Sequence, residues 1–562
     1  MALSSTAARF PRRTGNRWMI SAGLVALIVA LPMSGLLLEA LKGSADLWGH
    51  LISTTLPVAL LDTIVLLAGV GFVTATIGTT TAWLVTAYEF RGRRMLEWAL
   101  LLPLAVPTYI IAYAYLDILH PIGSVQGAIR WLLGYESPRQ FRLPDIRSMT
   151  GCILLLGFVL YPYVYIPTRA MFLTQSGNLI DAARTLGISR RAVFWRVALP
   201  LARPAVAVGI SLALMETLND VGAAEFLGVR TMTVSIYTTW ITRTDLPGAS
   251  QIALALLLIV VALVALERWA RRKQRYAMDA RRSRGLTPHR VSRPKGLLLL
   301  LAGLLPIALG FAAPALYLAT EAWKRYRFAG LSPRIVDEAV STIVIAAIAT
   351  ITTLLLGLVV AYATRVRPGA KSASLLRAST MGYAAPGTVV AIGVLVVLGA
   401  LDRFIDQTAI AWFGISTGLL FIGSGAAIIY ALTVRFLAIS AGGIEAGLSR
   451  IPNSLDHASR SLGRTQTGTF LQVHLPLSKT ALSAAALLVF VDCVKELPAT
   501  LLLRPLNVET FATHLYGEAA RGTYEEASIA ALAIVAISVL PVILLSRVGR
   551  SRTVPQSLIG AA

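Results

Sequence analysis

The chain has 562 residues, of which 56% are hydrophobic and only 14% charged, and its formal net charge at pH 7 is +23. Soluble domains carry about 25% charged residues, so this composition excludes a soluble protein and indicates an integral membrane protein. The positive charge lies mainly in short segments between apolar runs, which is how orientation in a membrane is set, and we expect membrane lipid and not nucleic acid as its partner.

Runs of about 20 apolar residues predict about twelve transmembrane helices. The first run, Trp18 to about Ala40, is longer than the apolar core of a signal peptide and lacks a clear cleavage site, so we expect it to be retained. In the first half the runs lie near 18–40, 58–86, 96–117, 150–172, 204–224 and 250–267. In the second half they lie near 296–319, 338–363, 378–400, 414–437, 481–502 and 525–546. Pro103, Pro107 and Pro386 fall in the third spans and are expected to bend them.

The arginine-rich segments divide the chain and predict its orientation. Cytoplasmic segments of membrane proteins are enriched in Lys and Arg, so both chain ends and the central linker are expected on the cytoplasmic side. The predicted organisation is a basic N-terminus (1–17), a six-helix module (18–267), a basic linker (268–295), a second six-helix module (296–546) and a tail (547–562).

A repeat relates the two halves. An offset of 276 residues superposes 182–205 on 458–481 with ten identities in 24 positions, among them Gly187 with Gly463 and Phe194 with Phe470. Shared hydrophobicity does not explain the match, because these segments are the least apolar part of each half. Six spans per half give both copies the same orientation, so the fold class is all-α integral membrane with two parallel six-helix repeats.

Each repeated segment is predicted to form a helix, a break and a second helix on the cytoplasmic side. Gly187 and Gly463 stand where a left-handed C-cap would end the first helix. Ser189 and Thr465 are suited to cap the second helix. A proline, Pro200 or Pro476, is then expected to end that helix, because it disfavours helical geometry in the residue before it. An ordinary loop that stabilises helix ends is the alternative, and two matching copies weigh against it.

The segment from Asp181-Ala182-Ala183 through Gly187 to Pro200 resembles the EAA motif of ABC importer permeases that work with a periplasmic binding protein. The resemblance implies the type I permease fold and a coupling helix that docks in a cleft of a cytoplasmic ATPase. The second copy departs from the motif, with His457-Ala458-Ser459 where Glu-Ala-Ala is usual. The residues that the resemblance assigns to the coupling loops are Asp181, Ala182, Ala183, Gly187, Phe194, Pro200, His457, Ala458, Ser459, Gly463, Phe470 and Pro476.

The stretch from Lys495 to Pro505, with the fused architecture, is similar to the double-length permeases of ferric-iron importers in the bacterial inner membrane. The sequence has no phosphate-binding loop with a Gly-Lys-Ser/Thr end, so we expect no ATPase site and no bound cofactor. ATP and Mg²⁺ would be used by partners. Two coupling loops predict two ATPase copies beside a periplasmic binding protein.

Carboxylates recur in the fifth spans. The offset of 276 places Glu216 on Asp492 and Asp220 on Glu496, and each half is expected to carry its two acids on one face of its helix. Ionisable groups inside a membrane usually face a bundle interior or an aqueous path, so these four and Lys495 are candidates for the translocation pathway. No fixed metal site is expected, and Fe³⁺, a hard cation, would contact Glu216 and Asp492 transiently. The alternative is structural, with Lys495 neutralising Asp492 or Glu496.

The leading hypothesis is therefore the permease subunit of an importer that moves ferric iron by alternating access. Thiamine, phosphonate and polyamine are the alternative substrates within the same class. A secondary transporter driven by an ion gradient is the alternative from another class, but such a carrier has no use for two docking loops. A membrane-bound enzyme has little support, since no nucleophile–base pair or metal motif stands out.

Overall fold

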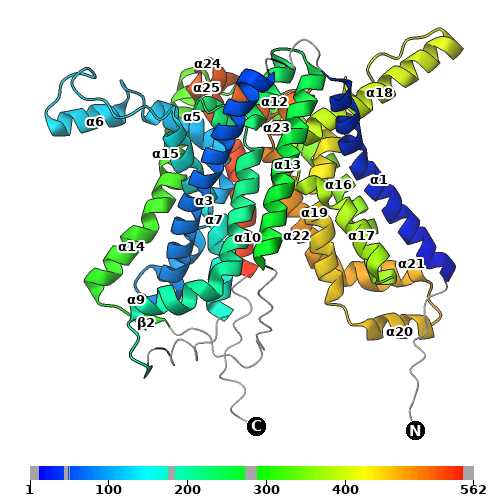
Figure 1. Ribbon diagram of the computed structural model, residues 1–562, viewed down its shortest axis with the longest axis horizontal. Coiled ribbons are helices and arrows are strands. Elements are labelled where there is room, and N and C mark those ends of the chain that lie inside the picture. The colour runs from blue at the N-terminus through cyan, green and yellow to red at the C-terminus, as the bar shows by residue number, and fades with distance from the viewer. Residues whose placement is uncertain are drawn as a thin grey trace. The chain divides into compact units, whose positions relative to one another are not determined.

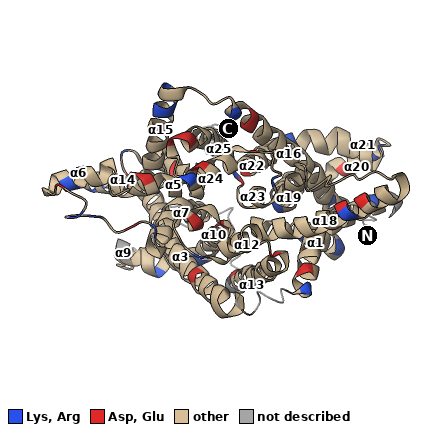
Figure 2. Cartoon of the chain, turned by 90° about the horizontal axis from the view of Figure 1, so that it is seen from above, with Lys and Arg blue, Asp and Glu red and all other residues tan. Residues whose placement is uncertain are grey.

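The computed structural model describes residues 12–43, 49, 51–174, 183, 185–271 and 288–548. These residues form helices joined by turns and a few longer loops, and their one pair of strands is the two-residue parallel pair β1 (Tyr88–Glu89) and β2 (His289–Arg290). The expected all-α class is confirmed. Most of the ribbon is tan in Figure 2, with Lys, Arg, Asp and Glu on short stretches only, as apolar spans require.

Within the described residues ten helices are long and apolar enough to cross a membrane. An eleventh span is a bent pair, Arg93–Ala105 and Thr108–Ile118, with an angle of 91° between its parts. Pro107 stands directly before the second part, where its missing N–H breaks the helix as predicted. The twelfth predicted span corresponds to α25 (Tyr524–Val548), whose side chains beyond residue 539 lie outside the described residues.

The chain divides into two compact units that do not coincide with its sequence halves. One unit comprises Met1–Trp48, Ile236–Leu254 and Pro333–Thr513, and the other comprises Gly49–Ser235, Ala255–Ser332 and His514–Ala562. The first helix of the chain thus belongs with the second half, and the first and last helices of the second half belong with the first. The six-helix modules 18–267 and 296–546 remain a prediction from the repeat. In the structure each compact unit contains helices from both of these sequence ranges.

The unit that contains most of the first half, called here the early unit, has an ordered series of helices. Its elements are η1 (Leu51–Thr55), α3 (Leu56–Ala87), β1, α4 (Arg93–Ala99), η2 (Leu102–Ala105), α5 (Thr108–Ile118), α6 (Ser124–Leu133), α7 (Met149–Thr174), α9 (Arg190–Val193), η3 (Phe194–Ala198), α10 (Leu199–Asn219), α11 (Gly222–Phe226), β2, α14 (Arg293–Ile307), η4 (Ala308–Ala312), α15 (Ala313–Ala329) and α25.

The other unit, called here the late unit, begins with the N-terminal helix and continues with second-half elements. They are α1 (Arg12–Lys42), α16 (Arg334–Val366), α17 (Ala370–Ser379), η5 (Met381–Tyr383), α18 (Gly387–Phe413), α19 (Ala426–Ser449), α20 (Asn453–Ser461), α21 (Gln466–Thr469), η6 (Phe470–His474), α22 (Leu475–Lys495) and α23 (Pro498–Leu503). The division falls within α12 (Met232–Ile241), α13 (Leu246–Arg271) and α24 (Phe511–Arg521).

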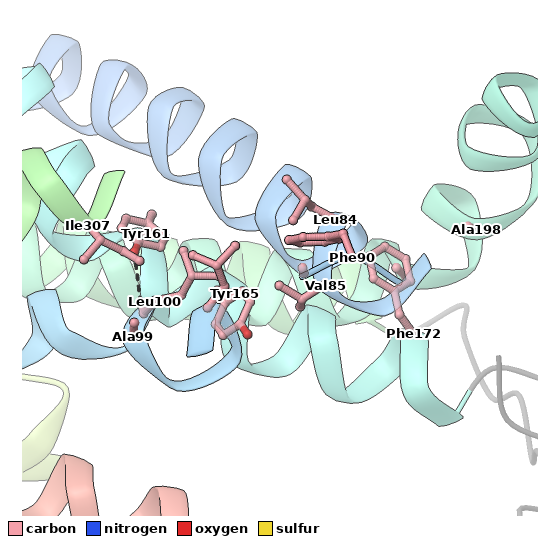
Figure 3. Packing of buried hydrophobic residues seen from close by; sticks show 13 residues of the cluster. Leu84, Val85, Phe90, Ala99, Leu100, Tyr161, Tyr165, Phe172, Ala198 and Ile307 are labelled. Atoms are coloured by element: carbon pink, nitrogen blue, oxygen red, sulfur yellow. Dashed lines mark hydrogen bonds between the residues drawn. The ribbon is translucent and has the colours of Figure 1, made fainter. Parts of the chain in front are cut away.

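Small residues allow the spans of the early unit to pack closely. Helices α3, α7 and α10 lie side by side (Figure 1). A Cβ on Gly78 of α3 would lie 2.7 Å from the Cβ of Val164 in α7, and one on Gly209 of α10 would lie 2.5 Å from the Cα of the same valine. Such close backbone approach replaces the hydrophobic effect, which is absent between helices in lipid. Around it lies the core of Figure 3, where Tyr161 donates a hydrogen bond to the carbonyl of Leu100 at 2.9 Å.

The late unit packs in the same manner, with α1 against α16 and α18. A Cβ on Gly393 of α18 would lie 2.2 Å from the carbonyl oxygen of Pro32, so the two helices touch through their backbones. Tyr430 of α19 donates to the carbonyl of Ile28 at 2.6 Å. The N-terminal helix is therefore an integral member of this unit and not an appended anchor.

Two predicted spans of the second half were wrong in their bounds. The spans expected near 378–400 and 414–437 are α18 (Gly387–Phe413) and α19 (Ala426–Ser449). The apolar residues after α18 do not continue as a helix, because Gly414 and Gly418 adopt left-handed backbone conformations with φ of +67° and +63°. Hydrophobicity alone could not separate that loop from the helices beside it.

Candidate functional site: coupling loops and broken fifth spans

In the first coupling loop Gly187 adopts the left-handed conformation that was predicted for it. Gly187 has a φ of +80°, and Ile188 donates its amide to the carbonyl of Ala183 at 3.1 Å. This is the longer bond of a Schellman cap. Ser189 then accepts the amide of Ala192 at 3.4 Å at the start of α9. Asp181 and Ala182 lie outside the described residues, while Ala183 is buried against Val193.

The second coupling loop has the same backbone. Gly463 has a φ of +76°, and Arg464 donates its amide to the carbonyl of Ser459 at 3.1 Å. Thr465 accepts the amide of Gly468 at 3.1 Å and caps α21. In this copy a helix (α20), a left-handed glycine and a capped second helix (α21) follow one another in the predicted order.

The two repeated phenylalanines anchor the loops inward and do not form their outer surface. Phe194 packs against Trp83, with ring centroids 5.2 Å apart. Phe470 is buried against Tyr362 at 4.6 Å and Trp18 at 5.6 Å. Each phenylalanine thus fixes its loop to the end of a span.

Leu186 and Leu462, which directly precede the two glycines, are the most exposed apolar side chains among the described residues of the loops. Sequence reasoning did not select them, although their identity at the 276-residue offset was a signal that could have found them. A pair of exposed leucines at equivalent turns is a surface that a protein partner could bury.

The expected role of Pro200 and Pro476 as helix ends was wrong. Each lies at the start of a long helix, α10 or α22, that continues directly from a π-helical turn, η3 (Phe194–Ala198) or η6 (Phe470–His474). A wider π turn accommodates the missing amide and the ring of proline without stopping the helix. The loop is therefore joined to the fifth span as one continuous helical element.

In the second copy the residues in place of Glu-Ala-Ala divide between surface and interior. His457 and Ala458 are exposed, whereas Ser459 is buried and bonded to the hydroxyl of Thr469 at 2.8 Å. The preceding acid, Asp456, is also buried. It pairs with Arg365 at 2.7 Å, and His474 Nε2 lies 2.7 Å from its other oxygen. This acid therefore braces the loop from within, and the acidic surface contact of the usual motif is absent from this position.

The fifth spans break at the second acid of each pair, which corrects the expectation of two acids on one helical face. Helix α10 ends at Asn219 and α22 at Lys495, and the next residues, Asp220 and Glu496, have extended backbones. A short helix follows each break, α11 or α23. The predicted spans 204–224 and 481–502 had run through these breaks.

Asp220 holds the break of the early unit through neutral partners. Its Oδ1 accepts the amide of Ala223 at 2.7 Å, at the start of α11, and the hydroxyl of Thr108 donates to its Oδ2. Thr108 is the first residue of α5, directly after Pro107. One buried carboxylate thus ties the broken fifth span to the broken third span.

Glu496 holds the break of the late unit through a cation, which comes from the fourth span. Its Oε1 accepts the amide of Ala499 at 2.8 Å and lies 2.5 Å from the guanidinium of Arg435, which comes from α19. Its Oε2 accepts the amide of Thr500 at 2.9 Å. Gly387, which follows Pro386 as Thr108 follows Pro107, leaves the space that Arg435 occupies, because a Cβ there would lie 2.9 Å from the guanidinium.

Glu216 and Asp492, the first acids of the pairs, lie on the helices before the breaks and are partly exposed. Asp492 pairs with Lys495 at 2.7 Å, so that lysine neutralises the first acid and Arg435 the second. Among the described residues no group of three or more His, Cys, Asp or Glu side chains could hold a metal ion. Sequence reasoning missed Thr108, Arg435 and Gly387, since only the fold brings them to the acids.

Comparison with known proteins agrees with this architecture. Residues 75–276 match the family of binding-protein-dependent transport system inner membrane components. The Fe(3+)-transport system permease protein FbpB 2 of Haemophilus influenzae is 23% identical over 539 residues, which cover 93% of this chain and 96% of that protein. The sulfate transport system permease protein CysT of Escherichia coli is 28% identical over 36% of this chain and 70% of its own. A probable molybdenum ABC transporter permease protein of Haloferax volcanii is 26% identical over 44% and 87%.

The relative from Haemophilus influenzae aligns along nearly the whole of both chains, so the double-length architecture is shared, whereas the other two match less than half of this one. The described residues hold ten or eleven candidate spans and two loops with the same backbone, and residues 75–276 match the permease family model. The chain is a multi-pass membrane protein that is similar to the binding-protein-dependent permeases of ABC importers.

Proposed function

We propose that this permease moves ferric iron, delivered by a periplasmic binding protein, into the bacterial cytoplasm. The observation that carries the proposal is the end-to-end likeness to a double-length permease named for Fe(3+) transport. The first acids of the two fifth spans, Glu216 and Asp492, are partly exposed, which suits a cationic cargo more than an anionic one.

The work of transport would come from two copies of a cytoplasmic ATPase, one on each coupling loop. ATP and Mg²⁺ would bind to those subunits, and this chain would hold no cofactor of its own. The exposed Leu186 and Leu462 would enter the clefts of the ATPase. Because each loop continues through its π-helical turn into a fifth span, a displacement of the loop would pass directly into that span.

The pathway would pass the first acids, Glu216 and Asp492, which are partly exposed and would contact Fe³⁺ transiently. Lys495 would release Asp492 to the cargo when the ion arrives. Asp220 and Glu496 would have a different task. They are saturated by hydrogen bonds and buried, so they would hold the breaks at which the fifth spans bend during alternating access.

The orientation follows from the positive-inside bias, with both termini and the central linker in the cytoplasm. On this side the coupling loops would meet the ATPase, and the opposite side would receive the binding protein.

An oxyanion is the competing cargo, because relatives named for sulfate, molybdenum and 2-aminoethylphosphonate match parts of the chain. Thiamine and polyamine are two further candidate cargoes. The test reconstitutes the permease in liposomes with the ATPase and binding protein encoded beside its gene and measures ATP-dependent uptake of labelled ferric iron, sulfate, molybdate, phosphonate, thiamine and polyamine. Preferential uptake of iron supports the proposal, and preference for any of the remaining cargoes overturns it.

The same liposomes distinguish an importer from an ion-coupled carrier. With the ATPase omitted, a pH or sodium gradient should drive no uptake. Uptake under that condition would overturn the importer mechanism, whatever the cargo.

A further inference from the structure

Two segments outside the coupling loops and the breaks share an unusual distribution of side chains. In the early unit the segment is α6, between the bent third span and α7. In the late unit it is the end of α18 with the loop that follows, residues 401–424, before α19. Since α7 and α19 each lead from these segments to a coupling loop, both segments lie at the span ends opposite to the loops.

Helix α6 buries its two long polar side chains and exposes most of its large apolar ones. Gln126 is only 2% exposed, donates to the carbonyl of Leu119 at 2.7 Å and accepts the amide of Leu143 at 3.1 Å. Arg130 is buried and donates to the carbonyl of Pro121 at 2.9 Å. On the same helix Trp131 is 83% exposed and Leu132 and Leu133 are exposed beside it, as is Ile122 just before the helix.

The end of α18 also combines hydrogen-bonded acids with large exposed apolar side chains, although Arg403, Gln407 and Thr408 are exposed beside them. Asp402 is 1% exposed and accepts the amides of Phe421 and Ile422, both at 3.0 Å. Asp406 accepts the amide of Thr417 at 2.7 Å and that of Gly418 at 3.1 Å. These bonds fold the loop back on the helix, while Trp412 is 80% exposed and Phe404, Phe413 and Ile415 also face outward.

Both segments also end alike. A tryptophan is followed by apolar residues and a glycine that caps the helix in a left-handed conformation, Gly134 after α6 and Gly414 after α18. The apolar side chains are therefore presented by capped, hydrogen-bonded structures. In water this arrangement would be reversed, because each exposed Å² of apolar surface costs roughly 25 cal/mol.

The chain itself indicates lipid as the occupant. Helix α18 has 27 residues and would be roughly 40 Å long, which exceeds a hydrocarbon layer of about 30 Å, so its last turns emerge into the headgroup region. Tryptophan is enriched at that depth, where its ring meets both acyl chains and polar groups. Arg139 and Arg147, exposed after α6, are placed to meet lipid phosphates.

We propose that α6 and the end of α18 are interfacial anchors, which seat Trp131-Leu132 and Trp412-Phe413 at the boundary between acyl chains and headgroups, in the leaflet opposite to the coupling loops. Each anchor holds the outer connection between a third and a fourth span. It thereby gives each unit a fixed reference in the bilayer against which its broken spans move.

The test places an environment-sensitive fluorophore on cysteine at Leu132→Cys or Phe413→Cys. The native cysteines Cys152 and Cys493 are buried and should stay unlabelled in the folded protein, which wild-type labelling checks. The matched control is Leu186→Cys, equally exposed but on a coupling loop. Each variant is reconstituted in phosphatidylethanolamine–phosphatidylglycerol vesicles that contain phosphatidylcholine spin-labelled at the fifth or the twelfth acyl carbon.

At positions 132 and 413 we expect at least about twofold stronger quenching by the shallow spin label than at 186, weaker quenching by the deep label and protection from iodide. At position 186 iodide should quench and neither spin label should. Iodide quenching at 132 and 413 equal to that at 186, without lipid quenching, would refute the anchors and leave these surfaces to water or to the binding protein. Leu133→Cys and Ile415→Cys replace any variant that does not fold.

Discussion

A buried acid holds the break in each fifth span, and this contact, called here a joint, has different partners in the two units. In the early unit the buried acid, Asp220, is satisfied by backbone amides and the hydroxyl of Thr108. In the late unit Glu496 receives the equivalent amide bond and also the guanidinium of Arg435, in a space that Gly387 leaves free.

The two joints thus share a carboxylate that accepts backbone amides of the next short helix, but only the late joint includes a positively charged partner. One joint carries an acid with neutral partners and the other an ion pair, so the two units should differ in how they tolerate the loss of a partner. A buried ion pair is costly to form and still more costly to split, whereas a hydroxyl bond is a smaller contribution.

The largest effect should come from Arg435→Met, which leaves Glu496 buried without its cation. We expect a loss of about 3–5 kcal/mol of stability, seen as a much lower Tm in detergent and loss of monodisperse protein. The double variant Arg435→Met with Glu496→Gln should recover most of it, because no charge then remains uncompensated. Equal Tm values for the single and double variants would show that the pair does not act as an ion pair.

The early joint should be less sensitive. Thr108→Val removes the hydroxyl that donates to Asp220 while keeping the shape of the side chain, and should lower stability by about 1.5–3 kcal/mol. Thr108→Ser, which keeps the donor, is the matched control and should stay near wild type. Thermal unfolding of the three proteins decides the point, and a loss as large as that of Arg435→Met would erase the proposed difference between joints.

A methyl group should distinguish the joints sterically. Gly387→Ala would place a Cβ 2.8 Å from Glu496 Oε1 and should cost about 1–3 kcal/mol. Thr108→Ala in the early joint introduces no such clash, although it removes the hydroxyl. Combining Gly387→Ala with Arg435→Met relieves the crowding at the guanidinium, so the two effects should be less than additive. Strict additivity in a double-mutant cycle would place the two residues in independent sites.

The smallest effect on stability should come from the coupling loops. Gly187→Val or Gly463→Val forces a β-branched residue into a left-handed conformation, at roughly 1–2 kcal/mol each. The consequence should be functional: ATPase activity that no longer responds to the binding protein, in a permease that still inserts. The buried Asp456–Arg365 pair braces only the second loop, so Gly463→Val should be the milder variant. Unchanged coupling in both would count against the docking role.

Local signals in the sequence predicted much of this site. The left-handed glycines, the caps at Ser189 and Thr465 and the break at Pro107 each depend on the conformational limits of one or two residues. The breaks after α10 and α22 were missed, because apolar residues continue through them and only a carboxylate capping the next helix reveals the end.

The sequence also could not predict that helices from the two halves pack within the same unit. Nothing in the pattern of α1 distinguishes a helix that packs in its own half from one that packs in the other, since both need only small residues at the contact. Gly393 and Pro32, 361 positions apart, meet only in the folded chain. Likewise, Arg435 lies in an apolar run, and nothing in the sequence indicates that the fold brings it to Glu496.

The exchange of first helices bears on biosynthesis. A ribosome that has released every helix from α3 to α11 has not yet made α14, α15 or α25, which complete the same unit. Membrane insertion can proceed span by span, but the early unit acquires its last neighbour only when the end of the chain emerges. A truncation that removes α25 should therefore destabilise the early unit, although most of that unit is encoded in the first half of the gene. Until translation ends, the early unit exposes helix surfaces that cellular quality control can recognise.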